Sequence, residues 1–148
     1  NTLQAIESRL EVMTIGPDKV NQLRHAKFLN GRLEDHMAAH ARILKPKFDA
    51  VERCLQQHLG NRDLATWTRP EGGYFVALST PPGFANRVVA MAATAGLALT
   101  PAGATFPHGY DPEDSVIRIA PTFASTSEIE TAIEVLAVCL ELSIRTGS

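Results

Sequence analysis

The sequence predicts a mixed α/β domain of the α+β kind, with a small three- to four-stranded sheet, helices packed on one face of it, and several helices before it. Three observations predict this class. Apolar residues recur at helical spacing through the first 60 residues, three later runs have strand composition, and an amphipathic pattern returns near the C-terminus. Hydrophobic residues make up 45% of the 148 residues, enough for a buried core.

The first two helices have clear boundaries. Residues 2–12 form the first, which Ile15-Gly16-Pro17 ends. Pro17 is expected in the first turn of the second helix, because its ring presets a helical φ and its missing N–H has no partner there anyway. Asp18 is then well placed near the positive end of the helix dipole. Asn30-Gly31 is a stop signal for this helix.

A longer helical stretch follows and contains a proline. Leu33, Met37 and Leu44 share one face, which predicts a helix up to Pro46. Because proline lacks a backbone donor, Pro46 is expected to break the helix or to start a new one. A second apolar stripe then continues to Gly60.

Strands alternate with helices in the second half. The expected strands are 73–78, 97–100 and 115–120, with a helix at 84–95 between the first two. Ser125 and Glu128 have the spacing of a capping box, which predicts that the last helix begins there.

Charge and composition exclude several classes of function. The net charge of −2 gives no bulk attraction to nucleic acid or to an anionic membrane, and no apolar run approaches the roughly 20 residues that span a bilayer.

Cys54 and Cys139 lie among apolar helical residues, so we expect buried free thiols in a reducing, cytoplasmic compartment. Asn1 is not a Met, so we expect the chain to begin inside a longer reading frame or to have been trimmed.

Arg118 is the most informative single residue. In an alternating strand Ile117 and Ile119 would face the helices, and Arg118 would face the other side. A guanidinium there suits a planar carboxylate, which it can bind with two parallel charge-assisted hydrogen bonds. The pattern alone favours a solvent-exposed arginine or a structural ion pair.

Other candidate motifs are weaker. His36 and His40 share a helix face, but no Glu follows the first His, so no metal site is expected. Glu71-Gly72-Gly73 precedes a strand instead of following one, so it predicts a turn and not a dinucleotide-binding loop. The loop 101–110 reads as a surface connection.

Three motifs together resemble one enzyme family. Trp67-Thr68-Arg69-Pro70-Glu71-Gly72-Gly73-Tyr74-Phe75, Leu99-Thr100-Pro101-Ala102-Gly103-Ala104-Thr105-Phe106 and Val116-Ile117-Arg118-Ile119-Ala120 occur in the order and spacing found in class I aminotransferases, the fold type I group of pyridoxal-phosphate enzymes. The segment Thr14–His25 resembles a bacterial aspartate-aminotransferase subgroup. In the proline loop, Ala102 stands where the usual pattern has glycine.

The resemblance implies both what this chain does and what it lacks. It identifies residues 1–148 as the C-terminal small domain of a larger enzyme, with 1–60 as a helical link from the large domain and 61–148 as the sheet and its helices. It assigns Arg118 to the substrate α-carboxylate. The lysine that binds pyridoxal 5'-phosphate lies upstream in the family's large domain, so the piece alone is expected to be inactive and without bound cofactor.

The resemblance further implies a homodimer. Asn21, Gln22 and Arg24 are the residues that could reach the partner's site, although a polar helix face is the simpler interpretation of this segment. The substrates would be an amino acid, with aspartate as the candidate that the subgroup resemblance suggests, and a 2-oxo acid. Two alternatives stay open: another fold type I activity such as an amino-acid lyase, and a non-catalytic α/β binding or assembly module.

Overall fold

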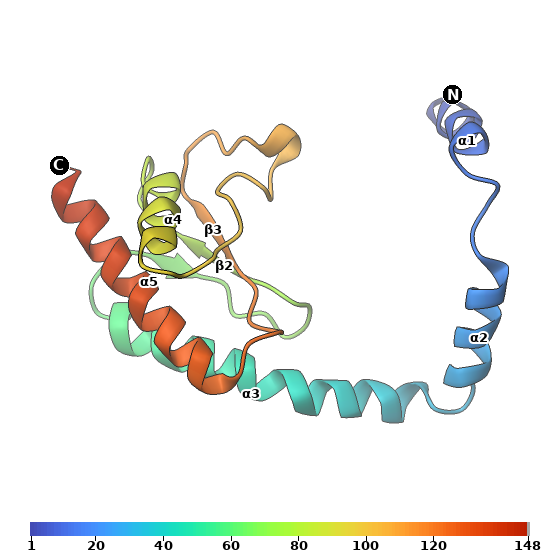
Figure 1. The fold of residues 1–148 in the computed structure, drawn as a ribbon, viewed down its shortest axis with the longest axis horizontal. Helices are drawn as coiled ribbons and strands as arrows, with labels where there is room; N and C mark the ends of the chain where they lie inside the picture. The colour runs from blue at the N-terminus through green and yellow to red at the C-terminus, as the bar shows by residue number, and fades with distance from the viewer. Residues whose placement is uncertain (148) are drawn as a thin grey trace. The chain divides into compact units, whose positions relative to one another are not determined.

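The computed structural model describes residues 1–147 and confirms the α+β class. Its elements are α1 Thr2–Met13, α2 Lys19–Leu29, α3 Leu33–Leu59, β1 Thr66–Trp67, β2 Val76–Ser79, α4 Ala85–Thr94, the short 3-10 helix η1 Pro107–Gly109, β3 Val116–Ile119 and α5 Thr126–Thr146 (Figure 1). They form two compact units, the first at Asn1–Ala41 and the second from Arg42 onward. Each unit is described by itself below.

A three-stranded antiparallel sheet lies in the second unit, in the order β1-β2-β3. In its register Ala77 lies opposite Arg118, and Leu78 lies opposite Ile117. The strands expected at 73–78 and 115–120 are confirmed in shorter form. The two-residue strand β1 was not expected from the sequence.

The expected strand at 97–100 is wrong. This segment has no strand pairing in the structure, and Leu97 and Leu99 instead pack half-buried against the core. The alternating apolar pattern that suggested a strand therefore reflects side-chain burial without a hydrogen-bonded ladder.

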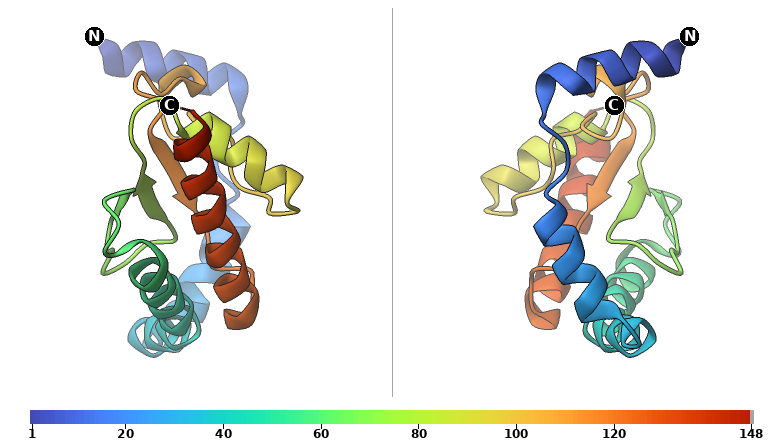
Figure 2. Two further views of the ribbon diagram at one scale, coloured as in Figure 1. Left: turned by 90° about the vertical axis from the view of Figure 1, so that its left-hand side faces the viewer. Right: turned by 90° about the vertical axis from the view of Figure 1, so that its right-hand side faces the viewer.

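The core of the second unit lies between the sheet and three helices. The C-terminal half of α3, α4 and α5 cover one face of β2 and β3 (Figure 2). The largest fully buried apolar side chains come from all of these elements: Val51, Leu55, Leu59, Leu78, Val88, Ile117, Leu136 and Leu140. The capping box at the start of α5 is confirmed, since the side chains of Ser125 and Glu128 each accept from the other's backbone N–H.

Helix α3 continues through Pro46, which corrects the expected break. Without a backbone N–H, Pro46 leaves the carbonyl of Arg42 without its helical partner, at a cost of about 3 kcal/mol in a helix interior. The next turns of α3 bury Ala50, Val51 and Leu55, and this packing outweighs the lost hydrogen bond.

The expected position of Pro17 is also wrong. It precedes α2 and does not lie in its first turn, because Asp18 is the N-cap and its side chain accepts from the N–H of Asn21. A carboxylate at the N-cap satisfies a free backbone donor, which makes Asp18 the better start signal.

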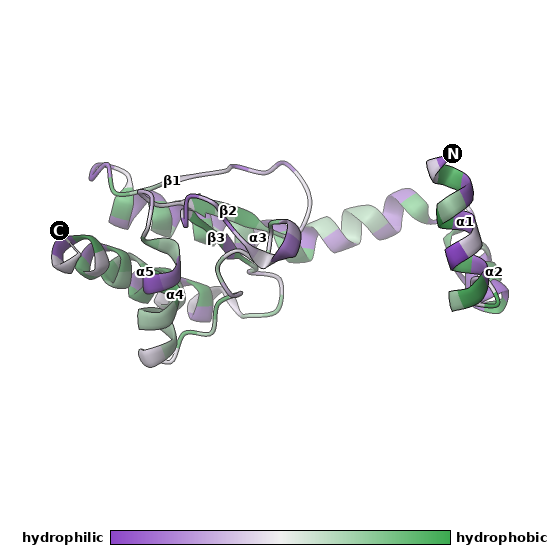
Figure 3. Cartoon of the chain, turned by 90° about the horizontal axis from the view of Figure 1, so that it is seen from above, coloured by the Kyte–Doolittle hydropathy of each residue, from purple (hydrophilic) through white to green (hydrophobic). Residues whose placement is uncertain are grey.

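The first unit contains α1, α2 and the first turns of α3, and neither α1 nor α2 has a buried residue. Along α1, Leu3, Ile6, Leu10 and Met13 recur at helical spacing and are all exposed. Figure 3 shows hydrophobic and hydrophilic positions interspersed along α1. This unpacked apolar stripe is typical of a surface that another protein surface covers.

Cys54 on α3 and Cys139 on α5 are buried free thiols, as expected. Burial raises the pKa of both thiols above the ordinary value, although the charge of neighbouring Arg53 partly opposes the rise at Cys54. Within residues 1–147, no helix combines the length and apolarity that a membrane crossing requires.

Candidate functional site

Arg118 lies on β3 as the alternation predicts. Ile117 and Ile119 are buried against the helices, whereas Val116 and Arg118 are only partly buried on the opposite side. The strand therefore holds the guanidinium on the face that the three helices leave uncovered.

Two neutral groups contact the guanidinium. The hydroxyl of Thr100 accepts from Nη2 at 3.2 Å and lies 3.4 Å from Nε. The ring of Phe75 lies beneath the guanidinium carbon, 4.5 Å from it, in cation–π geometry. Hydroxyl and ring hold the group in place without neutralising its charge.

The charge environment of Arg118 differs from that of the other arginines. It is the one arginine in the described part of the chain that is not exposed. Four exposed arginines pair with carboxylates, namely Arg53, Arg62, Arg69 and Arg145. No carboxylate of residues 1–147 forms an ion pair with Arg118. A partly desolvated cation without a counter-charge has the chemistry to accept an anion, because an anion would recover the lost solvation.

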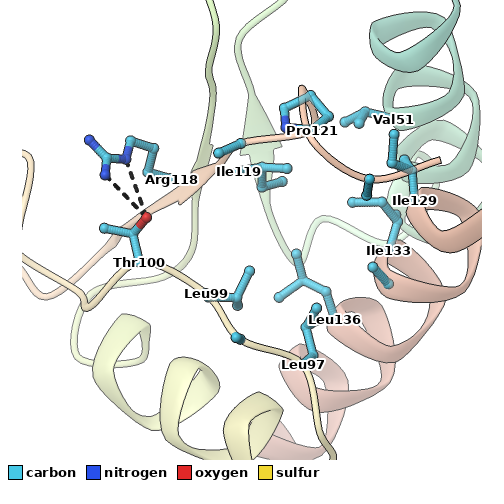
Figure 4. Close-up of a pocket in the computed structure, with 14 residues that line it drawn as sticks. Val51, Leu97, Leu99, Thr100, Arg118, Ile119, Pro121, Ile129, Ile133 and Leu136 are labelled. Carbon is cyan, nitrogen blue, oxygen red and sulfur yellow. Dashed lines mark hydrogen bonds between the residues drawn. The ribbon is translucent and has the colours of Figure 1, made fainter. Parts of the chain in front are cut away.

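A pocket of about 180 Å³ adjoins this residue. Its walls are mainly apolar and come from α3, α5 and the segments 97–100 and 118–121, including Val51, Leu97, Ile119, Ile129, Ile133 and Leu136. Figure 4 shows Arg118 and Thr100 at one end, with the guanidinium pointing away from these apolar side chains. The charged group therefore lies at the rim of the pocket and faces outward.

The segment before β2 is held from two sides. Trp67 Nε1 and Arg69 Nε each donate to the carboxylate of Glu52 on α3 at 2.7 Å. The backbone N–H and the hydroxyl of Thr68 both bond to the backbone of Ala77 on β2. These contacts fix the strand entry that carries Phe75.

Asp111 organises the approach to β3. Its carboxylate accepts from the backbone N–H groups of Glu113, Ser115 and Val116 at 3.1, 2.8 and 2.9 Å. Desolvation raises the pKa of Asp111, but these hydrogen bonds to the charged form outweigh it and hold the pKa below 3.8. The ionised side chain thus fixes where the strand of Arg118 begins.

The sequence did not identify Thr100 or Phe75 as site residues. The antiparallel register contained the signal for Phe75, since Arg118 lies opposite Ala77 and Phe75 is two residues away on the same face. Thr100 belongs to the unpaired segment 97–100, whose position follows only from tertiary packing.

Asn21, Gln22 and Arg24 lie on α2 in the first unit and are exposed, whereas Arg118 lies in the second unit. The carbonyl of Asn21 lies 2.8 Å from a ring nitrogen of His25.

His36 packs edge-on against the ring of Phe28, with 5.6 Å between the ring centroids. Through residue 147, no group of three or more His, Cys, Asp or Glu side chains could hold a metal ion.

The lysines do not fit a covalently bound aldehyde cofactor. Lys45 pairs with Asp49, and Lys47 donates to the carbonyl of Thr122. Lys19 and Lys27 lie exposed on α2. No lysine lines the pocket beside Arg118.

Comparisons with known proteins agree with the motifs. Residues 1–146 match the family described as aspartate amino-transferase. A candidate aminotransferase of Mycolicibacterium smegmatis is 48% identical over 88% of this chain and 31% of its own length. The crystal structure of an aspartate transaminase of Corynebacterium glutamicum superposes with a TM-score of 0.83 and 40% identity, over 92% of this chain and 32% of that one.

A more distant match has a bound cofactor. The kynurenine aminotransferase of Pyrococcus horikoshii, solved in complex with PMP, has a TM-score of 0.67 and 27% identity over 76% of this chain and 27% of its own. The chain thus spans about a third of the length of the relatives it matches.

Proposed function

We propose, from the premise that this chain belongs to the aspartate aminotransferase family, that it is one part of a pyridoxal-phosphate-dependent transaminase and provides the guanidinium that binds the substrate α-carboxylate. The observation that carries this proposal is the state of Arg118. It is partly buried, it is held by Thr100 and Phe75, and within the described residues no carboxylate pairs with it.

The chemistry of transamination fits such a group. The amino acid and the 2-oxo acid both carry a carboxylate next to the reacting carbon, so one cation can bind both. Arg118 would grip this carboxylate through paired charge-assisted hydrogen bonds and fix the orientation of the reacting carbon. Pyridoxal phosphate, when bound, supplies the electron sink for the reaction.

The cofactor belongs elsewhere in this proposal. Because the lysines of residues 1–147 do not fit it, we assign the cofactor to the large domain that the family possesses, and residues 1–148 to the small domain. The exposed apolar stripe of α1 supports this assignment, since it needs a covering surface. In a homodimer, Asn21, Gln22 and Arg24 would face the partner's site from α2.

The test is the variant Arg118→Gln in the full-length enzyme. We expect the KM of the amino acid and that of the 2-oxo acid to rise together by about 100-fold, in line with the loss of a charged pair worth about 2–3 kcal/mol. Arg118→Lys should recover little, because a point charge cannot reproduce the planar pair of donors. Arg53→Gln, at an exposed ion pair, is the matched control.

An unchanged KM in Arg118→Gln would show that this residue does not bind the substrate carboxylate.

The reaction type is tested separately by product analysis. A transaminase forms 2-oxo acid from the amino acid only when an acceptor 2-oxo acid is present in stoichiometric amount, whereas a lyase needs no acceptor.

A further inference from the structure

The contacts of Arg118 leave one edge of its guanidinium available. A guanidinium has two edges that can bind a carboxylate in parallel: the side edge, with Nε–H and one Nη2–H, and the end, with Nη1 and Nη2. The Thr100 oxygen lies 3.4 Å from Nε and 3.2 Å from Nη2, so it occupies the side edge. Phe75 covers one face of the plane. The hydrogen bonds to Thr100 use Nε and one N–H of Nη2, which leaves Nη1 and the second N–H of Nη2, at the end of the group, for a ligand.

Thr100 is itself held in a narrow range of conformations. The residue before a proline is restricted to extended backbone angles, and Pro101 follows directly. The β-branched side chain has few rotamers. Leu97 and Leu99, earlier in the same segment, are anchored half-buried against the core. The hydroxyl is therefore placed before any ligand arrives.

We propose that Thr100 is a positioning residue that, together with Phe75, presets Arg118 to bind a carboxylate end-on through Nη1 and Nη2. This inference rests on the proposed function, in which Arg118 binds the substrate carboxylate. Blocking the side edge leaves the ligand one bidentate geometry, so the carboxylate plane and the guanidinium plane align in one orientation. Thr100 thereby selects planar carboxylates over anions of other shapes without contacting them.

The experiment uses Thr100→Val, which replaces the hydroxyl with a methyl group of similar size, in the full-length enzyme. We expect the KM of the amino acid and of the 2-oxo acid to rise about 5-fold with kcat nearly unchanged, the effect of one lost hydrogen bond. The inhibition constant of propionate, an unreactive carboxylate, should rise by the same factor. Thr100→Ser retains the hydroxyl and should restore these constants to within about 2-fold.

Two further variants separate positioning from mere structure. Thr94→Val, at an exposed helix position, is the control for removal of a threonine hydroxyl and should leave both constants unchanged. In the Arg118→Gln background, Thr100→Val should have no additional effect, because its target is gone.

The outcomes distinguish this inference from the proposed function. If Arg118→Gln leaves KM unchanged, the proposed function and this inference both fail. If Arg118→Gln raises KM while Thr100→Val does not, only the positioning role fails. The positioning role would also be overturned if Thr100→Val raised KM by the same factor in the wild-type and Arg118→Gln backgrounds. It would likewise be overturned if Thr100→Ser failed to restore KM and the inhibition constant.

Discussion

The indole N–H of Trp67 donates to Glu52, and the same carboxylate accepts from Arg69 through its other oxygen, both at 2.7 Å. One side chain on α3 thus holds the strand entry at two points on either side of Thr68. These two hydrogen bonds also help to position Phe75, because Phe75 follows Arg69 by only six residues and its ring covers one face of the Arg118 guanidinium.

Replacing Glu52 with Ala should destabilise the protein by about 1–2 kcal/mol, because a half-buried indole N–H loses its acceptor. Glu52→Gln keeps an acceptor oxygen and should cost less. Arg69→Ala removes an exposed ion pair with Glu52 and an exposed hydrogen bond to Gln56, and it should cost under about 1 kcal/mol. Urea unfolding followed by the fluorescence of Trp67, the one tryptophan of the chain, measures all three. Equal costs for Glu52→Ala and Arg69→Ala would contradict this account.

The pH dependence of stability should reveal Asp111. Its pKa is lower in the folded state than its ordinary value of 3.8, so the unfolded state binds the proton more tightly. The contribution to stability is therefore complete above the unfolded pKa and is lost as the pH falls through the folded pKa. Asp111→Asn should lower stability near neutral pH and flatten the decline below about pH 4. An unchanged acid profile by urea unfolding at several pH values would exclude this role.

Two glycines with positive φ should respond differently to alanine. At Gly73, with φ of +91°, no atom lies near an added Cβ, so Gly73→Ala should cost only the backbone strain of about 1–2 kcal/mol. At Gly103, with φ of +84°, an added Cβ collides with the carbonyl oxygen of Gly109. Gly103→Ala should therefore lower the melting temperature clearly more than Gly73→Ala does. If the two variants were equally stable, the close approach of the loop to Gly109 would be refuted.

Pro46→Ala should stabilise α3 by up to about 3 kcal/mol, because alanine restores the backbone donor to the carbonyl of Arg42. Pro46 is exposed, so the change removes no core packing. The matched control is Lys45→Ala, which lies next to Pro46 and affects only an exposed pair with Asp49. Circular dichroism and thermal unfolding measure helicity and stability, and a loss of either in Pro46→Ala would show that the proline serves the native geometry.

The sequence predicted the local features of this molecule better than its pairings. The capping box at Ser125, the alternation around Arg118 and the helix α4 depend on neighbouring residues, so their patterns sufficed. Strand β1 and the unpaired segment 97–100 depend on partners distant in the chain, and no periodicity encodes those.

Pro46 failed as a break signal for the same reason. The packing of the following turns of α3 outweighs the local preference. The side of β3 on which Arg118 lies was predicted from strand alternation, whereas its substrate-binding role came from the family resemblance and stays a prediction. The groups that hold it, Thr100 and Phe75, emerged only from the tertiary arrangement.

Strand β3 is one of the two edge strands of its sheet, and among the described residues it pairs with β2. An edge strand can pair with a strand of another molecule, and a charged side chain on the edge strand opposes this pairing. We therefore expect the charge of Arg118 to oppose self-association through β3. We expect an apolar replacement of Arg118 to promote aggregation, which would obscure any effect on the proposed carboxylate binding. Glutamine, and not leucine, is therefore the informative substitution.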